Sequence, residues 1–351
     1  MGARGLVLAA GLLAVLAPAV RGHPDPGAAA AAVQAPPAPP ADVAAVIGEY
    51  GGPSERLVVL ERGGRLHADG GGLSDARLSR RAPTVWAVEA QPAVTLSFHR
   101  EGARVVAVTL RDRRLQRRDE GAEVEARIRA GVKADPDRLR TRALAASPPA
   151  EPTPRRALDL VDLTSVDPAI RLDVRYATSN NFMGIVLYER PAAYLQRPAA
   201  EALGRAQRAL AAKGYGLLVH DAYRPWFVTW MFWEATPPEH RIFVADPAKG
   251  SRHNRGAAVD LTLYDLRTGR AVEMPGRYDE LSRRSSPDYP GGTSLQRWRR
   301  DLLRREMERQ GFTVYPEEWW HFDYKDWRDW GIGNQTFAEL ARRRAAPGGA
   351  T

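Results

Sequence analysis

The sequence predicts two folded regions: a small all-β domain over residues 42–120 and an α+β domain with a mainly antiparallel sheet over residues 156–335. In the first region, short apolar and β-branched runs recur about every ten residues, with turn residues between them. In the second region, strand-like alternation is interrupted by stretches with helical periodicity. A chain of 351 residues is long enough to bury two hydrophobic cores.

The strands of the first region are indicated by hairpin signals. Leu57–Leu60 and Arg65–His67 flank the pair Gly63-Gly64, and two glycines between apolar runs are typical of a tight β-turn. Three further strands are expected at residues 85–88, 93–98 and 105–110. The segments Ile47–Tyr50 and Phe98–Gly102 resemble parts of a lipocalin-like barrel that is appended to some serine hydrolases. We assign no chemistry to this region.

Four segments lie outside the two domains. Residues 1–22 resemble a secretory signal peptide, because a short positively charged start is followed by the apolar stretch Leu6–Val20, which is too short to favour a stable membrane span. Residues 23–41 form an Ala/Pro-rich linker, residues 121–155 a helical piece and a second linker, and residues 336–351 a C-terminal tail. We therefore expect a periplasmic or secreted product, with an uncleaved anchor as the alternative.

Composition excludes several classes of function. The formal net charge is +9, but no basic block is interleaved with aromatic residues, which argues against nucleic-acid binding. The chain contains no cysteine, so thiolate nucleophiles, thiolate metal ligands and disulfide bonds are impossible. Any metal ligands must therefore be histidines and carboxylates.

The second region contains two clear amphipathic helices. Residues 198–213 carry a stripe of apolar residues, and Gly214 stands where a helix would end. Ser294 can cap a second helix that runs to Gln310. Strands are expected at residues 158–163, 170–176, 215–220, 257–263, 312–315 and 319–324. Together these patterns predict the α+β architecture.

Three residues in this region have the character of metal ligands. Asp260 lies within an apolar strand pattern that begins after Gly256, and an ionised carboxylate there is costly unless it is paired or binds a metal ion. His253 precedes this strand and His321 lies in a later one. Two imidazoles and one carboxylate form a three-ligand zinc set that leaves a fourth position for water, which is typical of catalytic sites. Glu318, three residues before His321, is placed to act as the general base.

Each of these residues also has a purely structural interpretation. A histidine beside an apolar run is most often a hydrogen-bonded core residue, and an aspartate in a strand often forms a salt bridge. A glutamate three residues before a histidine is common by chance. The joint pattern of His253, Asp260, Glu318 and His321 is much rarer than any of its parts, and it favours the metal site.

The spacing S-x-H-x-x-G-x-A-x-D followed by E-x-x-H resembles the VanX-type D-alanyl-D-alanine dipeptidases of zinc peptidase family M15. Two further blocks, Asp173–Gly184 and His220–Pro225, occur in the order expected of that family. The resemblance extends from about Leu160 to Trp330 and implies the hedgehog/DD-peptidase fold with one Zn²⁺ per chain.

The resemblance also assigns roles around the metal. It implies that Arg224 stabilises the oxyanion, that Ser251 helps to hold the substrate carboxylate, and that Asp279 binds the free ammonium group of a small dipeptide, D-Ala-D-Ala. Asn181 and Phe182 lie in a block that we expect to line the pocket.

Structural alternatives remain open for two of these residues. Arg224 is close enough in sequence to form a salt bridge with Asp221, and Asp279 could pair with Arg277 at the surface. Because every candidate catalytic residue lies beyond Pro154, we also expect the part of the chain after it to fold and to act on its own.

Three functions are compatible with these residues. The first is hydrolysis of D-Ala-D-Ala by a zinc dipeptidase, and the second is a related zinc D,D- or L,D-carboxypeptidase or endopeptidase that acts on peptidoglycan peptides. The third is a binding module with a non-catalytic zinc ion. We expect no nucleic-acid partner and no stable membrane span, and the sequence leaves the oligomeric state open.

Overall fold

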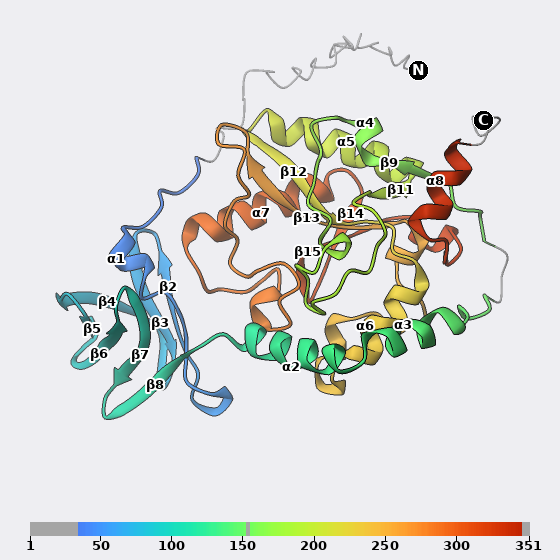
Figure 1. Cartoon of the computed structure of the whole chain (residues 1–351). Coiled ribbons are helices and arrows are strands. Elements are labelled where there is room, and N and C mark those ends of the chain that lie inside the picture. The colour runs from blue at the N-terminus through green and yellow to red at the C-terminus, as the bar shows by residue number, and fades with distance from the viewer. Residues whose placement is uncertain (1–33, 152–154, 346–351) are drawn as a thin grey trace, which may run out of the picture. The chain divides into compact units, whose positions relative to one another are not determined.

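The computed structural model describes residues 34–151 and 155–345 (Figure 1). The predicted signal peptide, and the linker up to residue 33, lie outside these residues. No helix among the described residues combines the length and the apolar character that crossing a membrane requires. The predicted all-β region and the predicted α+β region are both confirmed.

The N-terminal region is a closed barrel in which consecutive strands are hydrogen-bonded neighbours and the first strand pairs with the last. Its interior is filled by apolar side chains, among them Tyr50, Leu57 and Phe98. Gly63 and Gly64 adopt positive φ values of 57° and 81° in the turn that the sequence predicts. The strands are β1 (Gly48–Tyr50), β2 (Leu57–Arg62), β3 (Arg65–Gly70), β4 (Leu73–Ala82), β5 (Val85–Val88), β6 (Gln91–Glu101), β7 (Arg104–Leu110) and β8 (Arg113–Arg118).

Two helices follow the barrel, α2 (Glu120–Ala134) and α3 (Pro136–Ala145). The apolar face of α2 is buried in one cluster with Phe182, Phe232 and other residues of the C-terminal region. Because this apolar surface is shared, α2 belongs to the core of the C-terminal region rather than to a linker. The packing argues against the expectation that the part of the chain after Pro154 stands alone.

The C-terminal region is built on a five-stranded sheet with the strand order β10-β12-β13-β15-β14. Only β10 and β12 run parallel, and the other neighbours are antiparallel. A separate pair of strands, β9 and β11, lies beside it. The strands are β9 (Leu160–Asp162), β10 (Arg171–Leu172), β11 (Tyr194–Gln196), β12 (Tyr215–Asp221), β13 (Ala258–Asp265), β14 (Phe312–Tyr315) and β15 (Glu318–Tyr324).

Helices α5 (Arg197–Ala211) and α7 (Ser294–Glu308) form one hydrophobic core with the sheet. Residues Val259, Leu261 and Leu263 of β13 are part of this core. Because successive side chains of a strand point to opposite faces, Asp260 points away from it. The register of β13 and β15 then places Asp260 directly opposite His321.

The remaining helices complete the fold. They are α1 (Ala41–Ala44), α4 (Leu163–Val166), α6 (Trp226–Ala235) and α8 (Phe337–Ala345), with short 3-10 turns at Pro53–Glu55, Arg175–Ala177, Pro238–Phe243, His253–Arg255, Arg283–Ser285 and Trp327–Asp329. Phe337 and Leu340 of α8 are buried beside α6 residues, so the expected C-terminal tail contains a packed helix. The predicted cap of α7 is corrected by one residue, because Thr293 rather than Ser294 forms a capping box with Gln296.

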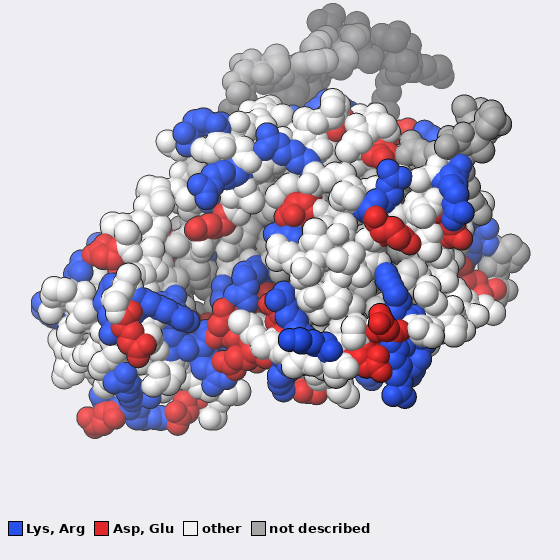
Figure 2. Space-filling view, in the orientation of Figure 1, with Lys and Arg blue, Asp and Glu red and all other residues white. Residues whose placement is uncertain are grey.

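The surface charges are mixed on the face that Figure 2 shows. Lys and Arg side chains alternate there with Asp and Glu side chains, without a broad area of a single sign. This distribution agrees with the diffuse net charge of the sequence.

Candidate active site

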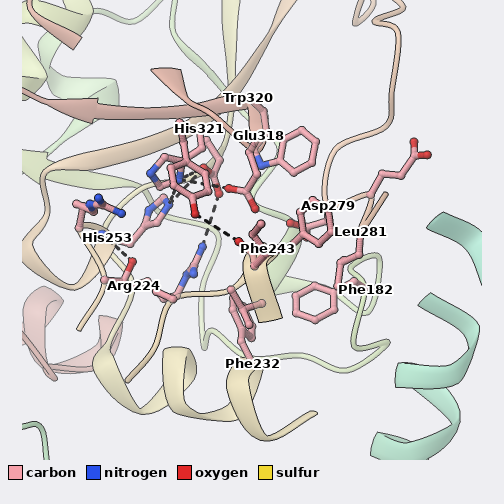
Figure 3. A pocket seen from close by; sticks show the side chains of 18 of the residues that line it. Phe182, Arg224, Phe232, Phe243, His253, Asp279, Leu281, Glu318, Trp320 and His321 are labelled. Carbon is pink, nitrogen blue, oxygen red and sulfur yellow. Dashed lines mark hydrogen bonds and ion pairs between the residues drawn. The ribbon is translucent and has the colours of Figure 1, made fainter. Parts of the chain in front are cut away.

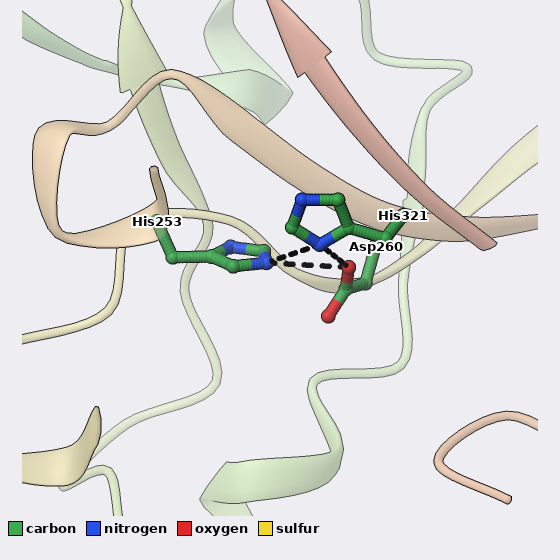
Figure 4. Close-up of side chains that lie close together, drawn as sticks. All are labelled: His253, Asp260 and His321. Carbon is green, nitrogen blue, oxygen red and sulfur yellow. Dashed lines mark hydrogen bonds and ion pairs between the residues drawn. The ribbon is translucent and has the colours of Figure 1, made fainter. Parts of the chain in front are cut away.

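Three side chains of the C-terminal region converge on one point (Figure 4). His253 Nε2 lies 3.0 Å from His321 Nδ1, and Asp260 Oδ1 lies 3.2 Å from the first nitrogen and 3.0 Å from the second. All three residues are buried. Gly256, at a φ of 62°, turns the chain from His253 into β13, where Asp260 follows four residues later. The predicted ligand set is therefore brought together.

The arrangement suits a metal ion better than an internal hydrogen-bond network. Asp260 Oδ1 is buried and accepts no hydrogen bond among the described residues, although two ring nitrogens face it. A buried carboxylate oxygen without a donor is costly unless a cation is bound. Atoms bound tetrahedrally to zinc at about 2.0–2.1 Å lie about 3.3 Å apart, which is close to the observed separations. The donor set of two nitrogens and one oxygen fits Zn²⁺.

Contacts on the far side of each imidazole orient the rings. His253 Nδ1 lies 2.6 Å from the carbonyl oxygen of Ala222, and His321 Nε2 lies 2.9 Å from Asp323 Oδ1. Each contact uses one ring nitrogen and leaves the other facing the shared point. Burial opposes ionisation of Asp323, but the neighbouring His321 outweighs it and lowers the pKa of this carboxyl. Asp323 was not predicted from the sequence.

Glu318 lies next to the three converging residues, but it is farther from His321 than Asp260 is. Its Oε2 lies 3.7 Å from His321 Nδ1, and its side chain is 13% exposed. Burial raises the pKa of Glu318 to about 8, although His321 acts in the opposite direction. Asp260 has the opposite shift, because His253 and His321 outweigh its burial and lower its pKa. Two neighbouring carboxyl groups therefore have different protonation behaviour.

Arg224 reaches the same point from the segment after β12 (Figure 3). Its Nε and Nη2 donate to Asp221 Oδ2 at 2.9 and 2.8 Å, and Nη2 lies 3.6 Å from Asp260 Oδ2. The guanidinium carbon lies 4.6 Å from the ring centre of Phe232. The salt bridge with Asp221 that the sequence allowed is thus present, and it orients a cation that also lines the cavity.

These residues share a small cavity of about 70 Å³ (Figure 3). Ser251 and Asp279 line it, as the sequence predicts, and Ser251 Oγ accepts a hydrogen bond from the His253 amide. Tyr176 donates a hydrogen bond of 2.9 Å to Asp279 Oδ1, whereas Asp279 Oδ2 is buried without a partner among the described residues. Burial, together with the nearby charge of Asp260, raises the pKa of the Asp279 carboxyl well above its usual range.

Comparison with known proteins identifies the family. Residues 156–342 match the family Peptidase M15, described as D-ala-D-ala dipeptidase. This chain belongs to peptidase family M15. One relative is a D-alanyl-D-alanine dipeptidase from Escherichia coli K12, which is 34% identical over 165 residues; the alignment covers 47% of this chain and 84% of the relative. Another is a D-alanyl-D-alanine dipeptidase from Enterococcus faecium, which is 36% identical over 175 residues; the alignment covers 45% of this chain and 87% of the relative. A Streptomyces coelicolor D-alanyl-D-alanine dipeptidase is 34% identical over 175 residues, 45% of this chain and 87% of that protein.

The two pocket residues that the sequence predicts in one block differ in position. Phe182 lines the small cavity, whereas Asn181 lines an adjoining pocket that also includes Phe182 and Asp279. The Asn181 amide nitrogen donates to three backbone carbonyl groups, at Arg175, Thr178 and Ile185, and its oxygen accepts from the amides of two following residues. With these bonds made, the side chain shapes the loop that presents Phe182.

Several cavity residues of the M15 peptidase were missed by sequence reasoning. Several of them are aromatic, among them Tyr176, Phe232, Phe243 and Trp320. Tyr176 lies within a block that the family resemblance already marked, so the sequence contained a signal for it. Phe243 lies in a segment without a motif, and only the fold brings it to the cavity (Figure 3).

Proposed function

We propose that this M15 peptidase hydrolyses the free dipeptide D-Ala-D-Ala, with one Zn²⁺ held by His253, Asp260 and His321. The observation that carries the proposal is that one small cavity contains three residues able to hold a metal ion and a carboxylate oxygen, Asp279 Oδ2, that has no partner among the described residues. The dipeptidases to which the chain is similar support the choice of substrate. The five-stranded, mainly antiparallel sheet supports the hedgehog/DD-peptidase fold as the finer description of the architecture.

The proposed mechanism divides the chemistry between the ion and the protein. Bound zinc acts as a Lewis acid that polarises a carbonyl group and lowers the pKa of water. Glu318 takes a proton from the attacking water and passes it to the leaving amine. Burial raises its pKa to about 8, and a raised pKa suits a carboxyl group that must both accept and release a proton.

Two further residues act on the substrate. Arg224, held in place by Asp221, supplies a fixed cation where negative charge develops on the peptide oxygen, so it favours the transition state over the bound substrate. Asp279 binds the free ammonium group, because a substrate cation would satisfy the carboxylate oxygen that has no partner among the described residues. Ser251 helps to hold the carboxylate at the other end of the dipeptide.

The first prediction concerns the free amino terminus. We expect rapid cleavage of D-Ala-D-Ala and a value of kcat/KM lower by about 10⁴-fold for N-acetyl-D-Ala-D-Ala, because the acylated nitrogen brings no charge to the buried Oδ2 atom of Asp279. The Asp279→Asn variant should narrow this ratio strongly while it retains zinc. Steady-state kinetics with the zinc-loaded protein on both compounds measures the effect.

The same assay separates the alternative functions. If the acetylated dipeptide or a wall pentapeptide is cut as fast as D-Ala-D-Ala, the carboxypeptidase function replaces the proposed one. If a zinc-loaded protein cuts none of the three, the site belongs to a non-catalytic binding module.

We also propose that the protein is exported, which the resemblance of residues 1–22 to a signal peptide supports. Amino-terminal sequencing of the mature protein should find a start beyond this segment. Recovery of the intact Met1 terminus from the cytoplasm would reject the proposal.

A further inference from the structure

The loop that carries Asp279 is held by the start of helix α2, which lies far away in the sequence. Arg277 donates two hydrogen bonds to Asp119, from Nη1 to Oδ2 at 2.6 Å and from Nη2 to Oδ1 at 3.2 Å. Asp119 is also the N-cap of α2, because its Oδ1 accepts from the Ala122 amide at 3.2 Å. One carboxylate therefore joins the first turn of the helix to the loop.

A second contact, between Gly121 of α2 and Glu280 on the other side of Asp279, is so close that a side chain at position 121 would not fit. Glu280 is buried, at 2% exposure, and accepts hydrogen bonds from the Arg277 amide and from Ser282 Oγ, both at 2.8 Å. Gly121, in the first turn of α2, packs directly against it. A Cβ atom at Gly121 would lie 2.3 Å from Glu280 Cγ, closer than real Cβ atoms approach other atoms.

Asp279 lies between these two contacts and has an unfavourable backbone conformation. Its φ is 57°, in the left-handed region that non-glycine residues rarely adopt. Such a conformation persists only where the neighbouring structure holds it. The contacts of Arg277 and Glu280 supply this restraint, two residues before and one residue after Asp279.

Helix α2 is a firm support because it is anchored in the core behind the cavity. Val124, Ile128 and Val132 are buried in the same cluster as Phe182 and Leu281, two residues that line the cavity. The family match begins at residue 156, so Asp119 and Gly121 lie outside the part of the chain that matches the family.

We propose that Asp119 and Gly121 are positioning residues for Asp279 and thereby set the selectivity of this peptidase for a substrate with a free ammonium group. The inference rests on the proposed function of Asp279. Helix α2 holds the loop at the distance at which the carboxylate meets the ammonium group in the cavity. A displaced loop weakens that hydrogen bond but leaves the metal ligands and Glu318 in place.

Gly121→Ala tests the close contact, and Gly131→Ala is its matched control. Both glycines lie in α2, where alanine is intrinsically favoured, but no atom of the described residues lies within 4 Å of a Cβ atom at the exposed Gly131. We expect Gly121→Ala to raise KM for D-Ala-D-Ala about tenfold, as partial loss of a charge-assisted hydrogen bond would. We expect kcat and zinc content to stay near those of Gly131→Ala, and the preference over N-acetyl-D-Ala-D-Ala to fall.

Asp119→Asn tests the ion pair, and Asp135→Asn is its matched control. Asparagine caps helices as well as aspartate does, and Asp135 caps α3 just as Asp119 caps α2, through Oδ1 and the Arg138 amide at 3.0 Å. Asp119 and Arg277 are partly exposed, at 38% and 45%, so we expect a smaller rise in KM, about threefold, in Asp119→Asn. Asp135→Asn should leave KM unchanged.

The outcomes separate this inference from the proposed function. If the wild-type protein shows no preference for the free dipeptide, the proposed function fails and the inference fails with it. If the preference is present but Gly121→Ala and Asp119→Asn both match their controls in KM and in the ratio of the two substrates, the inference alone is overturned. Should Gly121→Ala fail to fold, as judged by circular dichroism and zinc content, Asp119→Asn decides.

Discussion

At the scale of single residues, burial and neighbouring charge give the carboxyl groups of the cavity different roles. Asp260 faces two imidazoles and remains ionised, whereas Glu318 lies 3.7 Å from His321 and its pKa rises to about 8. Neighbouring carboxyl groups whose pKa values are pushed apart are typical of sites where one group binds charge and the other carries a proton. This pattern supports the roles of ligand and general base that the sequence predicts.

Replacement of Glu318 by glutamine tests the second of these roles. The amide has nearly the same shape and size as the carboxyl group, so Glu318→Gln should fold and retain zinc, but kcat should fall about 10²–10⁴-fold because the proton acceptor is lost. Single-turnover kinetics and metal analysis measure both properties. Glu317→Gln, one residue earlier and outside the cavity, is the control. A fully active, zinc-loaded Glu318→Gln variant would mean that another group accepts the proton.

Asp323 should act through the metal ligand that it contacts. Its hydrogen bond to His321 Nε2, at 2.9 Å, orients the ring, and loss of such a partner typically lowers metal affinity about 10–100-fold. We expect this loss in Asp323→Ala, measured as zinc release to a competing chelator. Asp326→Asn, an exposed position two residues after the end of β15, should bind zinc like the wild type. Equal zinc affinities in the two variants would contradict the role of Asp323.

At the scale of secondary structure, the register of β13 against β15 and the turn before β13 determine the geometry of the site. Asp260 and His321 are cross-strand partners, so a slip by one residue would move either side chain to the opposite face of the sheet. His253 enters from the turn that Gly256 closes. The geometry of the candidate metal site therefore depends on two strands and one turn rather than on any single element.

The turn can be tested with two glycines that share a backbone conformation. Gly256 and Gly214 have positive φ values of 62° and 84°, but only at Gly256 would a Cβ atom collide with a neighbour, Leu160 Cδ2, at 2.3 Å. Gly214→Ala should cost about 1 kcal/mol from backbone strain alone, and Gly256→Ala should cost more, about 2–4 kcal/mol, and lower zinc affinity. Chemical denaturation and zinc titration compare the two. Equal losses of stability in the two variants would show that the collision with Leu160 adds no cost to the backbone strain.

At the scale of the whole molecule, the hydrophobic core of the region that matches the M15 family also includes residues from outside that region. Helices α2 and α3 precede the matched region and contribute Val124, Ile128 and Ala143 to the cluster that contains Phe182. The barrel connects to the same region through Glu61, which is buried and accepts a hydrogen bond of 2.7 Å from the Ser294 amide at the start of α7. The N-terminal half is thus joined to the elements that support the site.

Truncation measures this dependence. A chain that begins at residue 155 lacks α2 and α3 and exposes the apolar surface that they cover, so it should aggregate or unfold at a lower temperature than a chain that begins at residue 119. Both chains lack the barrel, so the comparison isolates the two helices. Thermal unfolding and size-exclusion chromatography measure the difference. Equal stability and activity of the two chains would show that the region beyond Pro154 folds and acts on its own.

Patterns in the sequence were enough to predict the candidate site residues and several elements. The candidate metal ligands, Glu318 and Arg224 could be named because rare residue types at family spacings interrupt regular apolar patterns, and the helices around residues 198–213 and 294–310 could be placed by their periodicity. The role of Asn181 stays a prediction, because a motif marks a block of residues, whereas hydrogen bonds to the surrounding backbone determine where each side chain of that block lies.

Which distant segments meet is visible only in the folded chain. Periodicity shows that α2 has an apolar face, but it does not show which residues cover that face. The hydrophobic effect is non-directional, so any apolar surface of matching shape could cover it. The contacts of Asp119 with Arg277 and of Gly121 with Glu280 therefore had no signal in the sequence. They arise because α2 fills the core behind the cavity, and this packing brings its first turn against the loop of Asp279.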